Sequence, residues 1–140
     1  MSAPLVFITG ASSGIGQAFA ARYAQAGWRL ALAARRVGEI ENWAQLQGLG
    51  AERCLAYAAD VQQIDSIVGA GQRCLEQQGV PDVVIANAGI SVGIDTEIRE
   101  DLNVLADTLA INNTGLAATF HPFLAAMRKR EKKEPHGAAA

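Results

Sequence analysis

The chain has 140 residues, of which 50% are hydrophobic and 19% charged, and its formal net charge is −2. This length fits one domain, and the apolar half can bury enough surface to offset the entropy of folding, which excludes a disordered chain. The charge provides no broad positive field, so we expect neither nucleic acid nor a membrane as a partner. The N-terminus has no basic region and no long apolar run, so we expect a cytoplasmic protein.

Short apolar runs alternate with helical patterns along the chain. The runs are typical of strands buried on both faces of a parallel sheet, and the predicted strands are 5–8, 28–34, 54–59 and 83–86. Helical spacing of apolar residues predicts helices over 14–27, 37–47, 64–79 and 102–120. We expect Pro122 to kink or weaken the last helix. The alternation predicts an α/β fold, namely a Rossmann-type doubly wound parallel sheet of about four βα units.

A glycine-rich turn joins the first predicted strand to the first predicted helix. Gly10 allows a tight exit from the strand, Gly14 lets the backbone approach a pyrophosphate, and Gly16 permits close packing. The positive end of the helix would face the phosphates, and the hydroxyls of Ser12 and Ser13 add donors. The alternative is a turn whose glycines serve packing alone, and the strand-turn-helix context favours the phosphate site over it.

Four motifs in register resemble the short-chain dehydrogenase/reductase family. Residues 9–16 read TGASSGIG and match its TGxxxGIG signature, and the pair Asp60 and Val61 resembles its adenine-contacting residues. Residues 86–89 are similar to its NNAG with Ala86 in the first place, and Asn112 resembles the asparagine of its NxxG segment. The resemblance implies a carbonyl or alcohol oxidoreductase that uses NAD(P). The expected cofactor-binding residues are Gly10, Ser12, Ser13, Gly14, Ile15, Gly16, Arg35, Arg36, Asp60, Val61, Asn87, Ala88 and Gly89.

The end of the second predicted strand bears on which dinucleotide binds. An acidic residue there would accept hydrogen bonds from an adenosine ribose, but the chain reads Ala34, Arg35, Arg36. Arg35 could bind a 2′-phosphate in a bidentate, charge-assisted way, so we expect NADP(H) in preference to NAD. Two observations oppose this: the arginines could be a solvated pair at the helix entry, and Ser13 stands where many NADP-preferring relatives carry a basic residue.

The tyrosine and lysine on which the family's catalysis depends are missing. An unperturbed tyrosine has a pKa of about 10, and efficient proton transfer needs a neighbouring cation, which the family's YxxxK motif supplies. Tyr23 and Tyr57 are the only tyrosines, neither has a lysine four residues on, and all three lysines lie within 129–133. Of the family's catalytic set only Asn112 carries over. We therefore expect this chain to be inactive as an enzyme.

The last residues differ in composition from the rest. We expect residues 1–127 to form an incomplete NAD(P)-binding domain and 128–140 to form a basic, frayed tail unlike the family, truncated before the catalytic serine and YxxxK. Without the family's later strands, the strand at 83–86 becomes an exposed edge, which favours self-association.

Two further hypotheses about the function remain open. The chain could be a non-catalytic module that binds NADP(H) or a partner, or a truncated product with no function.

The two cysteines, Cys54 and Cys74, and the two histidines have no metal-ligand or disulfide spacing, so we expect no metal and no disulfide.

Overall fold

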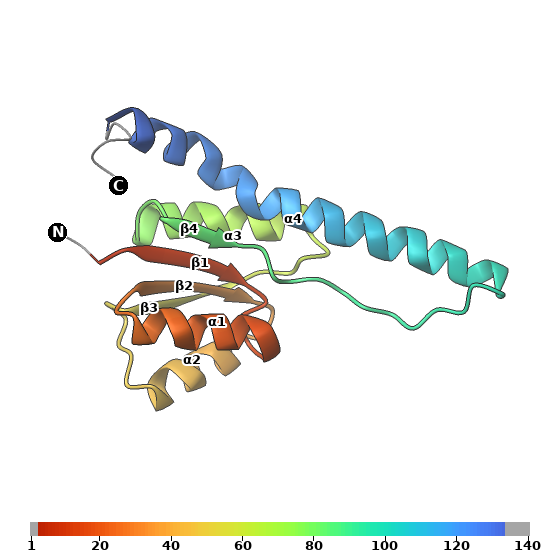
Figure 1. The fold of residues 1–140 in the computed structure, drawn as a ribbon, viewed down its shortest axis with the longest axis horizontal. Helices are drawn as coiled ribbons and strands as arrows, with labels where there is room; N and C mark the ends of the chain where they lie inside the picture. Colours follow the sequence, from red (N-terminus) through yellow and green to blue (C-terminus); the bar gives the residue numbers. More distant parts are fainter. Residues whose placement is uncertain (1–2, 134–140) are drawn as a thin grey trace.

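A computed structural model of the protein describes residues 3–133 and shows strands and helices in strict alternation (Figure 1). The elements are β1 (Leu5–Thr9), α1 (Gly14–Gln25), β2 (Arg29–Ala34), α2 (Val37–Leu46), β3 (Cys54–Ala58), α3 (Ile64–Gln77), β4 (Val83–Ile85) and α4 (Arg99–Lys133). The predicted strands and the first three helices agree with these bounds to within two residues at each end.

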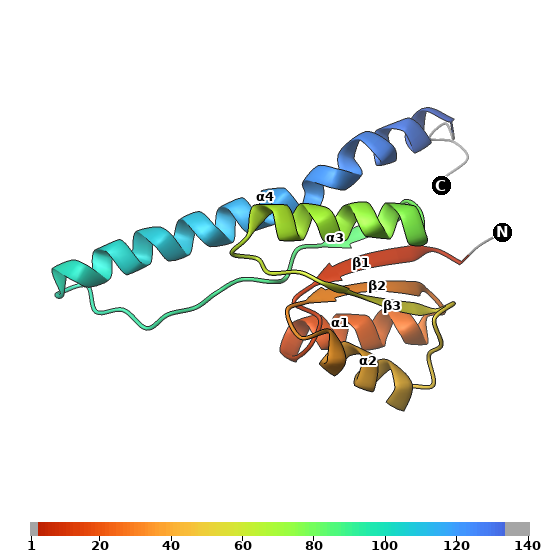
Figure 2. The same cartoon turned by 180° about the vertical axis from the view of Figure 1, so that it is seen from behind.

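The four strands form one parallel sheet in the order β3-β2-β1-β4. Helices α1 and α2 cover one face, and α3 and α4 lie on the other, as both views show (Figures 1 and 2). This arrangement confirms the predicted Rossmann-type α/β fold. Within residues 3–133, β4 lies at an edge of the sheet as expected, because its only neighbour there is β1.

The core consists of two apolar layers that meet in β1. Alternate residues of this strand point to opposite faces: Leu5 and Phe7 pack in the layer that includes α3 and α4, and Val6 and Ile8 in the layer that includes α1 and α2. All four are fully buried, and the ring centroid of Phe7 lies 4.8 Å from that of Phe123 in α4. A strand covered on both faces explains the continuous apolar run in the sequence.

Helix α4 is longer than the sequence suggested. It has 35 residues and continues through Pro122 to Lys133, so the prediction that residues 128–133 form a frayed tail is wrong. The helix changes direction in its light-blue part (Figure 1), which agrees with the expected effect of a proline inside a helix. The remainder of the predicted tail, 134–140, lies outside the described residues.

Arg130 explains why the end of α4 is held against the domain. Its guanidinium donates hydrogen bonds to the carbonyl oxygens of Val80 and Pro81, both at 3.2 Å. It also forms an ion pair of 3.1 Å with Asp82, whose other oxygen accepts the N–H of Leu5. The end of α4 is therefore tied to the loop before β4 and, through Asp82, to the start of β1.

Helices α3 and α4 approach each other closely at Gly71. A Cβ added at Gly71 would collide with the ring of Pro122. One added at Gly69, two residues earlier in the same helix, would lie 3.4 Å from the flexible end of Arg73. We expect Gly71→Ala to lower the free energy of unfolding by about 2 kcal/mol through overpacking, and Gly69→Ala to raise it by about 0.5–1 kcal/mol through helix propensity. Urea unfolding of both variants measures this, and a Gly71→Ala protein as stable as Gly69→Ala would contradict the packing described.

Both cysteines are free and buried, and burial suppresses their ionisation. Burial raises the pKa of Cys54 to about 11 and that of Cys74 to about 12, and it also raises the pKa of Tyr57. In the unfolded chain a thiol ionises at about pH 8.5, so unfolding releases protons above that pH. The contribution of the two buried neutral thiols to the free energy of unfolding is therefore complete below about pH 8.5 and is lost as the pH rises toward 11–12.

We expect two observable consequences of these raised pKa values. At pH 7.5 a thiol reagent should modify the native protein far more slowly than the urea-unfolded chain, because the thiolate is the reactive form. The midpoint temperature of thermal unfolding should decrease as the pH is raised from 8.5 to 10.5. This decrease should be smaller in a variant in which both cysteines are replaced by alanine. Equal thiol reactivity in the native and unfolded protein would contradict the burial.

Candidate functional site

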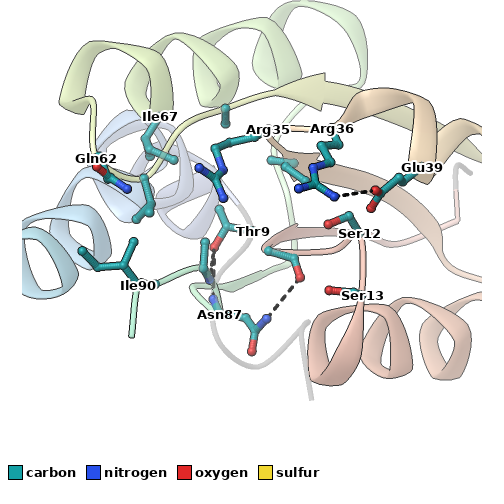
Figure 3. A pocket seen from close by; sticks show the side chains of 17 residues that line it. Thr9, Ser12, Ser13, Arg35, Arg36, Glu39, Gln62, Ile67, Asn87 and Ile90 are labelled. Carbon is teal, nitrogen blue, oxygen red and sulfur yellow. Dashed lines mark hydrogen bonds and ion pairs between the residues drawn. The ribbon is translucent and has the colours of Figure 1, made fainter. Parts of the chain in front are cut away.

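A cleft of about 380 Å³ opens where the carboxyl ends of the strands meet. Parallel strands bring the loops that follow them to one edge of the sheet, the usual position of ligand sites in open α/β folds. Figure 3 shows side chains from the turn after β1 and from the segments after β2, β3 and β4 around one space. The predicted residues that line it are Gly10, Ser12, Ser13, Arg35, Arg36, Val61, Asn87, Ala88 and Gly89.

The other predicted residues lie beside the cleft rather than in its wall. Gly14, Ile15 and Gly16 form the first turn of α1, where the Ile15 side chain is 69% exposed. Asp60 follows β3, and its Oδ1 accepts the backbone N–H of Gln62 at 3.0 Å. Asn112 lies within α4.

The glycine turn has the backbone geometry for which its glycines were singled out. Gly10 and Gly14 have φ of 65° and 56°, in the left-handed region where a side chain is strained. A Cβ on Gly16 would collide with the carbonyl oxygen of Gly10 and lie 2.8 Å from Nδ2 of Asn87, whereas one on Gly14 would meet nothing within 4 Å. Gly16 therefore serves packing, and Gly14 leaves space open at the start of α1.

Thr9 connects the glycine turn to the segment after β4. Its Oγ1 accepts the backbone N–H groups of Asn87 and Ala88 at 3.0 and 3.1 Å, and Asn87 Nδ2 donates to the carbonyl oxygen of Gly10 at 3.3 Å (Figure 3). Thr9 is 1% exposed, so these hydrogen bonds are shielded from solvent. The sequence marked Thr9 only as the start of the turn and gave no sign of this bridge, because its partners lie almost eighty residues away.

Asn112 holds the segment that runs on from Gly89. Its Oδ1 accepts the N–H of Ile90 at 2.7 Å, and its Nδ2 donates to the carbonyl oxygen of Ile90 at 2.9 Å. Both ends of the amide are therefore engaged by one backbone unit, and Ile90 itself lines the cleft. In this structure Asn112 acts as a positioning residue for the wall of the cleft, and the catalytic role expected for it remains a prediction.

Charge in the cleft wall comes from Arg35, Arg36 and Glu39. Arg36 forms an ion pair of 3.1 Å with Glu39, three residues further along the chain. Glu39 is a residue of the cleft that was not predicted from the sequence, although its spacing from Arg36 suits such a pair. Arg35 is exposed and, within residues 3–133, its side chain has neither a hydrogen bond nor an ion pair. Figure 3 shows its guanidinium extending into the space between Gln62 and Thr9. One guanidinium is thus available to an anionic ligand.

Two further features of the structure bear on the expected partners. Among the described residues, no group of three or more His, Cys, Asp or Glu side chains could hold a metal ion. In the same part of the chain, no helix is long and apolar enough to cross a membrane.

A parallel sheet with a glycine turn leading into a helix N-terminus, and a cleft across the strand ends, defines a Rossmann-type NAD(P)-binding fold. The family description "short chain dehydrogenase" matches residues 4–134. The chain therefore belongs to the short chain dehydrogenase family, as its motifs indicated, and the match extends beyond the boundary expected at residue 127.

Known proteins of this family share the sequence and the fold over most of the chain. An uncharacterised oxidoreductase of Mycobacterium tuberculosis is 33% identical over 131 residues, which are 90% of this chain and 38% of that protein. An alcohol dehydrogenase of Thermococcus sibiricus, solved with 5-hydroxy-NADP, is 30% identical with a TM-score of 0.73, covering 91% of this chain and 55% of that one. A short chain dehydrogenase/reductase of Burkholderia phymatum, solved with NAD, is 28% identical with a TM-score of 0.77, covering 93% and 46%. The chain thus spans about half the length of these relatives, or less.

Proposed function

We propose that this chain binds NADP(H) in the cleft at the strand ends, as the dinucleotide-binding part of a short-chain oxidoreductase. The observation that carries the proposal is that Ser12 and Ser13, which directly precede the N-terminus of α1, and the unpaired guanidinium of Arg35 line one cleft. A helix N-terminus suits a pyrophosphate, and a guanidinium suits a phosphate monoester. The cleft therefore offers a positive group for each anionic part of NADP.

The pyrophosphate end of the proposal rests on the start of α1. Ser13 is the N-cap of the helix, and its side chain makes no capping hydrogen bond. The first N–H groups of the helix thus lack the usual side-chain acceptor, and the helix dipole favours an anion there. Gly14 leaves the approach open, because a Cβ would meet nothing within 4 Å of it. Ser12 and Ser13 line the same wall and add hydroxyl donors.

The adenosine end of the proposal rests on the segments after β2 and β3. Arg35 would bind the 2′-phosphate, with Arg36 beside it, and Val61 would provide an apolar wall for the adenine, since all three residues line the cleft. Asp60 engages one carboxylate oxygen with Gln62 N–H, which leaves the other for the adenine amino group. Solved relatives carry either NAD or an NADP analogue, so the preference for NADP comes from Arg35 and from the absence of a carboxylate directly after β2.

Bound NADP(H) would supply the hydride chemistry, and we propose that the 140-residue chain binds it without turnover. Neither tyrosine is in the cleft: Tyr57 is buried and donates its hydroxyl to Gln78 Oε1 at 2.9 Å, and Tyr23 packs against Trp28. Nor does any lysine line the cleft. A carbonyl substrate would therefore meet no positioned proton donor of the kind this chemistry needs.

Titration of the purified chain with NADPH and NADH, followed by cofactor fluorescence, tests the binding. We expect saturable binding of both cofactors, with NADPH bound more tightly, and no NADPH oxidation when simple ketones and aldehydes are added. A folded protein that binds neither cofactor would contradict the proposed function. Carbonyl reduction that copurifies with this chain would contradict the absence of turnover.

The position of β4 favours a second property, self-association through the sheet edge. The N–H and C=O groups on the outer side of β4 have no strand partner, and such edges pair readily with other strands. We expect sedimentation to show dimers or larger species, whose share falls as the chain is diluted. A monomeric native chain at tens of micromolar would contradict this property.

A further inference from the structure

One charged side chain in the cleft wall has a sign opposite to the ligand proposed there. Of the residues that line the cleft, only Arg35, Arg36 and Glu39 carry charge. Glu39 lies in the first turn of α2, directly beside the place assigned to the 2′-phosphate. The binding of a doubly charged phosphate next to a carboxylate requires an explanation.

The two arginines differ in their partners. Nη1 of Arg36 lies 3.1 Å from Oε1 of Glu39, and Figure 3 shows Arg36 turned toward that carboxylate. Arg35, by contrast, extends into the cleft without a partner among the described residues. Glu39 therefore neutralises one of the two positive charges at this end of the cleft.

The ion pair between Arg36 and Glu39 is weak enough to be reversible. The side chains are 75% and 45% exposed, and exposed pairs three residues apart contribute little net stability. A phosphate arriving at Arg35 can recruit Arg36 from Glu39, since a guanidinium binds phosphate in a charge-assisted way. The carboxylate then remains close to the phosphate, without its partner, and repels it.

We propose that Glu39 is a specificity-determining residue, which pairs with Arg36 in the absence of ligand and limits how strongly the cleft prefers a 2′-phosphorylated dinucleotide. This inference rests on the proposed NADP(H) binding. Glu39 lowers the affinity for NADPH and leaves that for NADH unchanged, because only NADPH carries the phosphate that the carboxylate opposes. The affinity of the native chain for NADPH is therefore below what its two arginines allow.

The test compares NADPH and NADH affinities of the native chain with those of Glu39→Gln at low ionic strength. We expect Glu39→Gln to bind NADPH about 3–10-fold more tightly, as for the loss of one partly screened like charge, and NADH within about twofold of native. Adenosine 2′,5′-bisphosphate should show the same gain and adenosine 5′-monophosphate none. Adding Arg36→Gln to Glu39→Gln should reduce the gain, because the freed guanidinium contributes to it together with the loss of the repelling carboxylate.

Glu41→Gln is the matched control. It removes the same charge from an exposed position in α2 that does not line the cleft, and we expect it to leave the ratio of the two affinities unchanged. Thermal unfolding monitored by circular dichroism verifies that both variants remain folded.

The outcomes separate the two levels of the proposal. Native protein that binds no NADPH overturns the proposed function itself. Native protein that prefers NADPH, together with a Glu39→Gln variant whose preference is unchanged or lower, overturns the role of Glu39 alone. The same holds if Glu41→Gln produces an equal gain, because the effect would then be one of overall charge.

Discussion

Gly16→Ala is expected to abolish cofactor binding and to lower the free energy of unfolding by about 3 kcal/mol, the upper part of the range for overpacking a tight site. The added methyl group would clash with the backbone oxygen of Gly10 and with the side-chain amide of Asn87. Both belong to the wall of the cleft, so relief of the clash displaces the surface that the pyrophosphate would contact.

Gly69→Ala is the control for this substitution, since it is also a helical glycine but has room for the methyl group. Urea unfolding gives the stability, and NADPH titration at a temperature where both variants are folded gives the affinity. A Gly16→Ala protein that binds NADPH as the native chain does would show that the turn after β1 is not the phosphate site.

Arg35→Ala is expected to weaken NADPH binding by about 10–100-fold and to change NADH binding by less than about threefold. Its guanidinium is exposed, extends into the cleft and has no partner to lose, so the substitution removes a ligand contact and little else. A charge-assisted hydrogen bond contributes about 1.5–3 kcal/mol, which corresponds to this range of affinity.

The salt dependence provides a second readout for Arg35. Because charge attraction is screened, raising the ionic strength should weaken NADPH binding to the native chain more than to Arg35→Ala. Arg128→Ala, a change at an exposed arginine near the end of α4, is the control. Equal losses of NADPH and NADH affinity in Arg35→Ala would place the arginine at some part of the ligand other than the 2′-phosphate.

Local patterns were sufficient to predict most of the fold. The run from Leu5 to Ile8 is apolar at every position because β1 is covered on both faces, and such runs ending at glycine turns are visible without any knowledge of contacts. The order of strands and helices then follows from the chain itself. For the same reason the residues of the glycine turn and of the segment after β4 were found, since each directly follows a strand.

The parts that the sequence did not predict depend on contacts between distant segments. Nothing near Arg130 in the chain indicates that it reaches Asp82, and without that contact a basic segment is expected to fray. The bridge from Thr9 to Asn87 and the capture of Ile90 by Asn112 are equally remote in sequence. Glu39 differs, because its spacing from Arg36 was visible, but only the cleft shows that the pair adjoins a ligand site.

The most direct test of NADP(H) binding in the cleft is an amide NMR spectrum of the chain recorded during addition of NADPH. If NADPH binds in the cleft, saturable shifts are expected only at the residues around it, above all Gly10 to Gly16, Arg35, Val61 and Asn87 to Ile90, with the amides of α3 beyond Gly69 unchanged. A folded chain whose shifts fall elsewhere, for example along the outer edge of β4, or whose spectrum does not change at all, would contradict it.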